Sequence, residues 1–324
     1  MKKHLLLSIF SLFIMASSFS QDAYVSIESQ FALGSSLVDR SAKTAIDSEG
    51  NRIVFGSFSE ELDFDPSESE FILEPLGSPD LFLASYDPDG NINWAFNLGR
   101  ISLNDGMVAS GLAIDSDNNL IISGGFSLNV DFDPSANNSV LTAVQGLDGF
   151  VAKYDNTGQL VWVQQFGSVG SDAVSAVAID DDGNHILGVR FGAEIDLNLS
   201  EEEEDLLTPV GGVDAAVLKL DPNGDYVWSY SVAPDVNNEI VTSLAANSSG
   251  RIAMGALVDG ISTGIPSQGM LAGVLNSDGT EDWTYDFQNQ GQSNTISHIA
   301  FSEDEENIYL GGRIQEDTDF DPSE

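Results

Sequence analysis

Apolar and polar residues alternate along this chain in short blocks, and each block ends at a turn rich in Asp, Asn and Gly. In the block 94–98, the apolar side chains Trp94, Phe96 and Leu98 occupy every second position. A period of two is typical of a β-strand, because successive side chains of a strand point to opposite faces. Two such blocks on either side of an Asx-Gly turn predict a β-hairpin. The pattern recurs along most of the chain, so we predict an all-β protein.

The four tryptophans reveal an internal repeat, because each lies four residues after the glycine of a short polar turn. The four glycine–tryptophan pairs, to which we assign a structural role, are Gly90 and Trp94, Gly158 and Trp162, Gly224 and Trp228, and Gly279 and Trp283. The apolar block before the turn and the block that contains the tryptophan form one hairpin, and a second hairpin precedes it in every repeat. Each repeat therefore supplies four short antiparallel strands, which we call a, b, c and d.

This four-stranded repeat predicts a β-propeller of four-stranded antiparallel blades, because each sheet can bury its two faces only against its neighbours. Sandwiches and up-and-down barrels do not predict one tryptophan per four strands. The tryptophans are 68, 66 and 55 residues apart, and the shortening leaves only a brief linker after Val258, between strands b and c. We predict four complete blades and part of a fifth, in residues 36–100, 101–168, 169–234, 235–290 and 291–324.

The two ends of the chain extend this prediction. Residues 1–20 combine two lysines with a short apolar run and small residues, which is typical of a secretory signal peptide and too short for a membrane span. Residues 21–35 contain a d-like strand, with Ser29 in the place of the tryptophan, and we expect this strand to close the last blade. The sequence stops at Glu324 within the fifth unit, so we expect a truncated ring.

The second repeat shows the whole unit, in segments 112–126, 130–134 and 148–158 followed by Trp162. This unit resembles the SBBP-type β-propeller repeats of secreted proteins, especially those of Bacteroidota. The third repeat has Asp196-Leu-Asn198 in place of Asp-Phe-Asp, and the fourth repeat lacks that insertion. Many members of the family end in a C-terminal sorting domain, and this sequence contains none. The resemblance implies a secreted or cell-surface protein of a Gram-negative bacterium, and it implies no reaction.

The amino-acid composition restricts the kinds of partner that this protein can bind. Without residues 1–20, the chain carries 9 basic and 52 acidic side chains, a net charge of −43. Such a surface repels nucleic acid and anionic lipid, and it attracts divalent cations or basic partners unless it serves only as a solvated acidic coat. The chain contains no cysteine, so its stability depends on packing alone. We therefore expect no nucleic-acid partner and no membrane insertion after removal of the signal peptide.

The sequence Asp-Phe-Asp-Pro occurs three times between strands b and c, at residues 63–66, 131–134 and 319–322. These connections lie at one end of the predicted sheets, so their carboxylates are expected on one face, where calcium would find oxygen ligands. The candidate ligands are Asp63, Asp65, Asp131, Asp133, Asp319 and Asp321. In the alternative interpretation the motif is structural: Asp caps the turn, Phe packs inward and Pro ends the strand. No twelve-residue calcium loop ending in Glu follows the motif, which favours the alternative.

Few residues offer catalytic chemistry. His185 and His298 belong to no spaced metal or triad pattern, and we interpret them as ordinary surface or strand residues. Thr157-Gly158 precedes Trp162 as in quinoprotein propellers, but only this repeat carries the threonine, so we expect the tryptophans to pack between blades and hold no cofactor. Residues 201–204 are four consecutive glutamates, which predict a solvated loop.

Together these observations predict a non-catalytic exported scaffold that binds a protein or a glycan at the cell surface, with calcium as its one candidate cofactor. The alternative is a carbohydrate-active propeller enzyme, a hydrolase or lyase with carboxylates in the central channel. Asp39, Asp172 and Glu239 recur near the start of strand a. An active site requires carboxylates in distinct environments, so this recurrence favours the scaffold.

Overall fold

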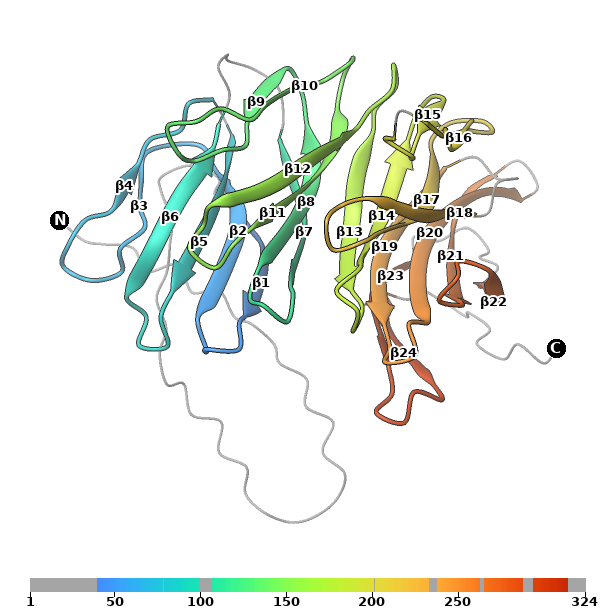
Figure 1. Ribbon diagram of the computed structural model, residues 1–324. Helices are drawn as coiled ribbons and strands as arrows, with labels where there is room; N and C mark the ends of the chain where they lie inside the picture. The colour runs from blue at the N-terminus through green and yellow to red at the C-terminus, as the bar shows by residue number, and fades with distance from the viewer. Residues whose placement is uncertain are drawn as a thin grey trace, which may run out of the picture. The chain divides into compact units, whose positions relative to one another are not determined.

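In the computed structural model of the protein (Figure 1), every helix or strand element that the structure describes is a β-strand. The structure describes residues 40–77, 79–99, 107–200, 202–232, 238–262, 265–287 and 294–313, all within one unit of residues 31–324. Among these residues, no helix is long and apolar enough to cross a membrane. The predicted signal peptide, the predicted closing strand and Asp39 lie outside the described residues.

The strands form four-stranded antiparallel sheets in chain order, as predicted. Blade 1 consists of β1 (Arg40–Ile46), β2 (Arg52–Phe58), β5 (Asp80–Tyr86) and β6 (Ile92–Leu98). Blade 2 consists of β7 (Val108–Ile114), β8 (Leu120–Phe126), β11 (Asp148–Tyr154) and β12 (Leu160–Phe166). Blade 3 consists of β13 (Ala173–Ile179), β14 (His185–Phe191), β17 (Asp214–Leu220) and β18 (Tyr226–Val232). Blade 4 consists of β19 (Glu239–Ala246), β20 (Ile252–Ser262), β21 (Ile265–Leu275) and β22 (Glu281–Phe287).

Shorter elements complete the described part of the chain. Strands β23 (Thr295–Phe301) and β24 (Ile308–Arg313) are the first two strands of a fifth unit. Small hairpins stand between strands b and c of the first three blades: β3 (Leu62–Asp63) with β4 (Ile72–Leu73), β9 (Asn129–Asp131) with β10 (Val140–Thr142), and β15 (Ile195–Asp196) with β16 (Leu206–Leu207). We call these three segments the insertion hairpins.

The b-to-c connection of blade 4 differs from the prediction. The brief linker expected after Val258 does not begin there, because β20 continues to Ser262 and β21 starts at Ile265. Backbone pairing runs without a break from Val258↔Gly269 to Ser262↔Ile265. Without an insertion hairpin to interrupt them, the two strands extend their antiparallel hydrogen-bond ladder beyond the body of the sheet.

The sheets pack against one another through their first strands. Strand β7 packs against β1 and β2, β13 against β7 and β8, β19 against β13 and β14, and β23 against β19 and β20. Among the described residues, the d strands β6, β12, β18 and β22 show no comparable backbone packing against a neighbouring sheet. Stacked layers would bring all strands of two sheets together, whereas sheets that spread outward from adjacent a strands form a propeller. The predicted fold is therefore confirmed.

We call the interface between consecutive blades a seam, and in the seams on either side of blade 4 a hydroxyl ties the inner part together. Each of the five described a strands contains a register shift, as between Val174 and Ala176 of β13. The residue left over in this bulge, Ser175, donates its hydroxyl hydrogen bond to Val241 O of the next blade at 2.6 Å. Thr242 donates in the same way to Ile296 O. The bulge thus directs a hydroxyl toward the neighbouring a strand.

The outer part of the first three blades is filled by the insertion hairpins. In seam 1–2, Phe132 of the second insertion hairpin belongs to a core that joins Phe55 of blade 1 to Phe126 and Phe150 of blade 2. The ring of Phe132 lies 5.6 Å from that of Phe126 and 4.9 Å from that of Phe150. Such aromatic contacts and the burial of the rings stabilise the seam. The second insertion hairpin therefore acts as a wedge between diverging sheets, and so does the third, whose Leu197 shares a core with Val151 of blade 2 and Leu187 of blade 3.

The tryptophans close the outer rim of the seams. Trp94 Nε1 donates to Asn156 O, and Trp228 Nε1 donates to Ser277 O, both at 3.1 Å. Each acceptor lies in the c-to-d turn of the following blade. In the second of these turns Gly279 has φ +84°, and a Cβ atom added to it would lie 2.6 Å from Trp228 Cδ2. The glycine is needed both for the turn and for the approach of the indole.

We predict that Gly279→Ala destabilises the protein more than Gly90→Ala. Both glycines have positive φ, and at either position alanine costs roughly 1–2 kcal/mol in the left-handed region. At Gly90 the nearest atom to an added Cβ is 3.7 Å away, so only Gly279→Ala also displaces an indole. Urea unfolding should show the larger loss for Gly279→Ala; equal losses would contradict an indole contact across the seam.

Candidate functional site

The Asp-Phe-Asp-Pro motifs form the turns of the first two insertion hairpins. Asp63 Oδ1 accepts hydrogen bonds from the main-chain N–H groups of Asp65 at 3.0 Å and Phe71 at 2.9 Å. Asp131 Oδ1 accepts the equivalent pair at 3.1 and 2.9 Å. One carboxylate oxygen thus closes each hairpin, which is the capping role that the alternative interpretation gave to the motif.

The second residue of the motif anchors the insertion hairpin to its own blade. Phe64 and Phe132 are fully buried. Tyr86 donates its hydroxyl hydrogen bond to Phe64 O at 3.0 Å, and Tyr154 donates to Phe132 O at 2.7 Å. Each tyrosine ends a c strand, so the hydrogen bond fastens the hairpin along the sheet from which it emerges. Both observations fit a structural motif.

The motif carboxylates are not assembled into a recognisable metal centre in the described part of the chain. No group of three or more His, Asp or Glu side chains there could hold a metal ion. Asp65 and Asp133 instead accept the N–H groups of Ser67 and Ser135, each at 2.8 Å. Asp319 and Asp321 lie outside the described residues. Calcium binding therefore stays a prediction.

Acidic residues at the start of the a strands are buried in the seams. Asp172 and Glu239 have no exposed surface. The Asp172 carboxylate accepts the N–H groups of Ser168 at 2.6 Å and Gly192 at 2.9 Å, and the main-chain N–H of Asp172 donates to Leu147 O at 2.7 Å. These bonds tie the entry of blade 3 to its own sheet and to blade 2. Asp172 thus has a structural role, whereas a catalytic carboxylate must reach substrate.

The two histidines have different surroundings. His298 lies exposed in β23, whereas His185 begins β14 and is fully buried. His185 Nδ1 lies 3.0 Å from Asp221 O, and the imidazole meets the Trp162 ring edge-on at 5.3 Å. Burial, followed by the nearby Lys153 ammonium, lowers the pKa of His185 from 6.5 to about 4. A neutral imidazole that donates through Nδ1 fits this site, which belongs to seam 2–3.

Two buried ion pairs were not predicted from the sequence. Lys153 Nζ lies 2.9 Å from Asp115 Oδ2 in blade 2, and Lys219 Nζ lies 2.8 Å from Asp180 Oδ2 in blade 3. Each pair joins strand c to the a-to-b turn of the same blade, beside the asparagine that also bonds the aspartate. The signal was present, because lysine occupies the same position before the c-to-d turn in both repeats. These pairs are structural.

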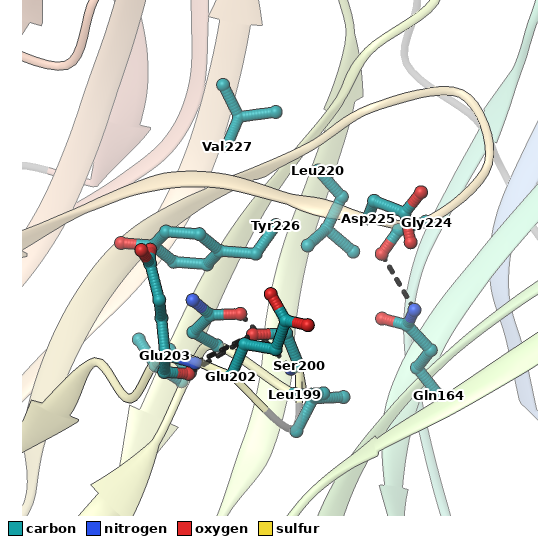
Figure 2. A pocket seen from close by; sticks show the side chains of 12 residues that line it. Gln164, Leu199, Ser200, Glu202, Glu203, Leu220, Gly224, Asp225, Tyr226 and Val227 are labelled. Atoms are coloured by element: carbon teal, nitrogen blue, oxygen red, sulfur yellow. Dashed lines mark hydrogen bonds between the residues drawn. The ribbon is translucent and has the colours of Figure 1, made fainter.

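A pocket with a volume of about 510 Å³ opens in seam 2–3 (Figure 2). Gln164 of β12 forms one wall, Tyr226 and Leu220 of blade 3 form another, and the third insertion hairpin forms the floor. Three carboxylates line it: Glu202, Glu203 and Asp225. The glutamates are exposed as predicted, and Glu201 lies outside the described residues. The sequence alone did not indicate that they border a cavity.

Comparisons with known proteins agree with a repeat architecture and go no further. No protein-family model matches the chain. An uncharacterized WD repeat-containing protein of Acanthamoeba polyphaga mimivirus is 30% identical over 156 residues, which is 45% of this chain and 11% of the viral protein. The chain therefore spans about a tenth of that relative, as aligned.

Two solved structures are similar at low identity. A protein of unknown function from Bacteroides caccae is 11% identical, with a TM-score of 0.28 over 73% of this chain and 93% of that one. A gluconolactonase from Xanthomonas campestris is 11% identical, with a TM-score of 0.28 over 85% of this chain and 94% of that one. TM-scores this low carry no argument about activity.

We predict that Asp131→Ala lowers the free energy of unfolding by about 1–2 kcal/mol, because two N–H groups lose their acceptor. Asp131→Asn keeps a side-chain oxygen and should cost less. Both effects should be the same in EDTA and in millimolar calcium, as measured by urea unfolding. A calcium-dependent rise in stability that either substitution removes would establish the metal site instead.

We predict that His185 makes stability fall as the pH drops from 6.5 to about 4. The folded pKa is depressed, so in this window the unfolded chain binds a proton that the folded chain does not, and folding weakens by on the order of 3 kcal/mol. His185→Leu, which introduces the residue that blade 2 has at Leu120, should flatten this part of the profile. His298→Gln is the control, and an equal change in both variants would contradict the prediction.

Proposed function

We propose that this chain is a non-catalytic, exported β-propeller scaffold that binds a protein partner of basic character. One observation carries the proposal: the buried and half-buried polar side chains that recur with the repeat are used for the scaffold itself. Asp63 and Asp131 close hairpins, Asp172 ties two blades together, and Lys153 is paired with Asp115. The chemistry that recurs with the repeat therefore supports the fold, and binding depends on the surface.

The surface favours a basic partner. The chain has a formal net charge of −41 at pH 7, and its acidic residues outnumber its basic residues by 52 to 11. A charge of this size raises the rate of encounter with cationic partners and disfavours anionic ones. Similarity to a WD repeat-containing protein supports a scaffold in which blades present a binding surface. A glycan partner lacks this electrostatic attraction unless it carries amino groups.

Export and calcium belong to the same proposal. Residues 1–20 support export, because their basic start, short apolar run and small residues fit a cleavable signal. Outside the cytoplasm calcium reaches concentrations at which weak oxygen-ligand sites fill. Calcium would then bridge exposed carboxylates other than Asp131, whose Oδ1 closes the second insertion hairpin, without taking part in a reaction.

The proposal is tested by offering the purified protein immobilised peptides of equal length that are basic, neutral or acidic, together with neutral and acidic polysaccharides. We expect binding to the basic peptides only, and a loss of affinity of about tenfold or more as NaCl rises from roughly 50 to 500 mM, because salt screens exposed charges. Release of reducing ends from any polysaccharide would support the carbohydrate-active alternative. Polysaccharide binding without peptide binding would replace the proposed partner with a glycan.

A further inference from the structure

The pocket in seam 2–3 occupies a place that aromatic rings fill in seam 1–2. In seam 1–2, Phe96 of strand d packs on Tyr154 with ring centroids 5.3 Å apart. Tyr154 in turn bonds to Phe132 of the insertion hairpin. Three large side chains, from two blades and one hairpin, therefore close the outer part of that seam.

At all three equivalent positions of seam 2–3, a residue without an aromatic ring replaces the aromatic residue of seam 1–2. Gln164 lies two residues after Trp162, where Phe96 lies two residues after Trp94. Leu220 pairs with the first residue of strand b, as Tyr154 does in blade 2. Leu197 stands for Phe132 in the motif. Smaller side chains thus replace three aromatic rings at the place in the seam where the pocket of about 510 Å³ opens.

The groups that face this cavity accept hydrogen bonds more than they donate them. The protein already uses three side-chain donors: Tyr226 donates to Asp205 at 2.9 Å, Gln164 Nε2 to Gly224 O at 2.7 Å, and Ser200 to Glu203 O at 3.2 Å. Gln164 Oε1, which has almost no accessible surface, has no hydrogen-bond partner among the described residues.

The carboxylates of Glu202, Glu203 and Asp225 lie exposed along the same pocket, and no hydrogen bond from the described residues engages their oxygens. Besides these acceptors, the lining includes one side-chain donor with no acceptor among the described residues, the amide of Asn198. A guest must therefore supply N–H groups and positive charge. Leu199 and the Tyr226 ring add apolar surface for the remainder of the guest (Figure 2).

We propose that this pocket binds an arginine side chain of the protein partner. The inference rests on the proposed function and names the contact that it uses. A guanidinium presents five N–H donors in one plane, so it can reach acceptors on several walls, and its planar face stacks on a tyrosine ring. A lysine ammonium offers three donors at one point and does not match separated acceptors as well.

The test uses two small probes, N-acetyl-arginine methylamide and its citrulline analogue, which has nearly the same shape without the charge. Binding to the purified protein is followed by ¹⁵N NMR shifts. We expect the arginine probe to shift residues of the pocket and the citrulline probe to bind about tenfold or more weakly. Equal binding of the two probes, or shifts confined to other blades, would overturn the proposal.

Two sets of variants test whether the arginine probe binds in this pocket. Gln164→Phe combined with Leu220→Tyr rebuilds the ring pair of seam 1–2 and should fill the part of the pocket between blades 2 and 3. We expect arginine binding to fall at least about tenfold while the fold is retained, since seam 1–2 already tolerates this pair. Removing three charges with Glu202→Gln, Glu203→Gln and Asp225→Asn should weaken binding by about tenfold, and a matched removal elsewhere should change it by less than about twofold. The matched variant is Glu68→Gln, Glu70→Gln and Asp89→Asn, all exposed in blade 1.

Failure of this inference is distinguishable from failure of the proposed function. If the filled variant binds the basic peptides and the arginine probe as well as the unaltered protein does, the pocket is not the site and the scaffold proposal stands. If the arginine probe binds in the open pocket only and no peptide binds, the pocket stands and the protein partner is wrong. A preference for the lysine counterpart of the probe would overturn the assignment to arginine.

Discussion

Sheets that spread outward from neighbouring inner strands leave gaps that widen toward the rim, and filling those gaps is the constraint on which this structure depends. Protein interiors are packed as densely as organic crystals, so a gap of this kind must be filled by protein atoms or remain a cavity. Hydroxyls from strand bulges bridge the narrow inner part, as Ser175 does toward Val241. Insertion hairpins fill the outer part, and indoles such as Trp94 reach the next blade at the rim.

The need to fill the seams with hairpins explains why the same polar residues recur at equivalent positions of the repeat. A wedge hairpin must satisfy its own backbone groups while its aromatic side chain is buried, because an unpaired buried N–H costs about 1–3 kcal/mol. Asp131 and Tyr154 supply those partners in blade 2, and Asp63 and Tyr86 do so in blade 1. An acidic motif that looks like a cation site is, in these two blades, part of the packing. Function is therefore to be sought where the pattern is interrupted.

Seam 2–3 is such a place. There the aromatic positions hold Gln164, Leu197 and Leu220, and a pocket bordered by carboxylates lies where aromatic rings pack in seam 1–2. The same seam buries His185 against Trp162 beside the Lys153 ion pair. One interface of the propeller thus contains both a cavity and a buried histidine, for which blades 1, 2 and 4 have Arg52, Leu120 and Ile252. A scaffold built from equivalent units acquires a specific binding site by altering the filling between two of them.

The sequence by itself determined the strands, the hairpins and the propeller. Period-two blocks and Asx-Gly turns are local signals, and the regular spacing of four tryptophans makes a repeated sheet the simplest way to bury them. Sequence pattern also allowed a capping role for the motif aspartates, but it left calcium binding open because capping and coordination use the same oxygens. Only the tertiary structure decided that Phe132 is a wedge between blades, that His185 is buried, and that Glu202 borders a cavity. Those properties arise from residues about 20 to 70 positions apart meeting across a seam, and no local pattern records which side chains will face one another there.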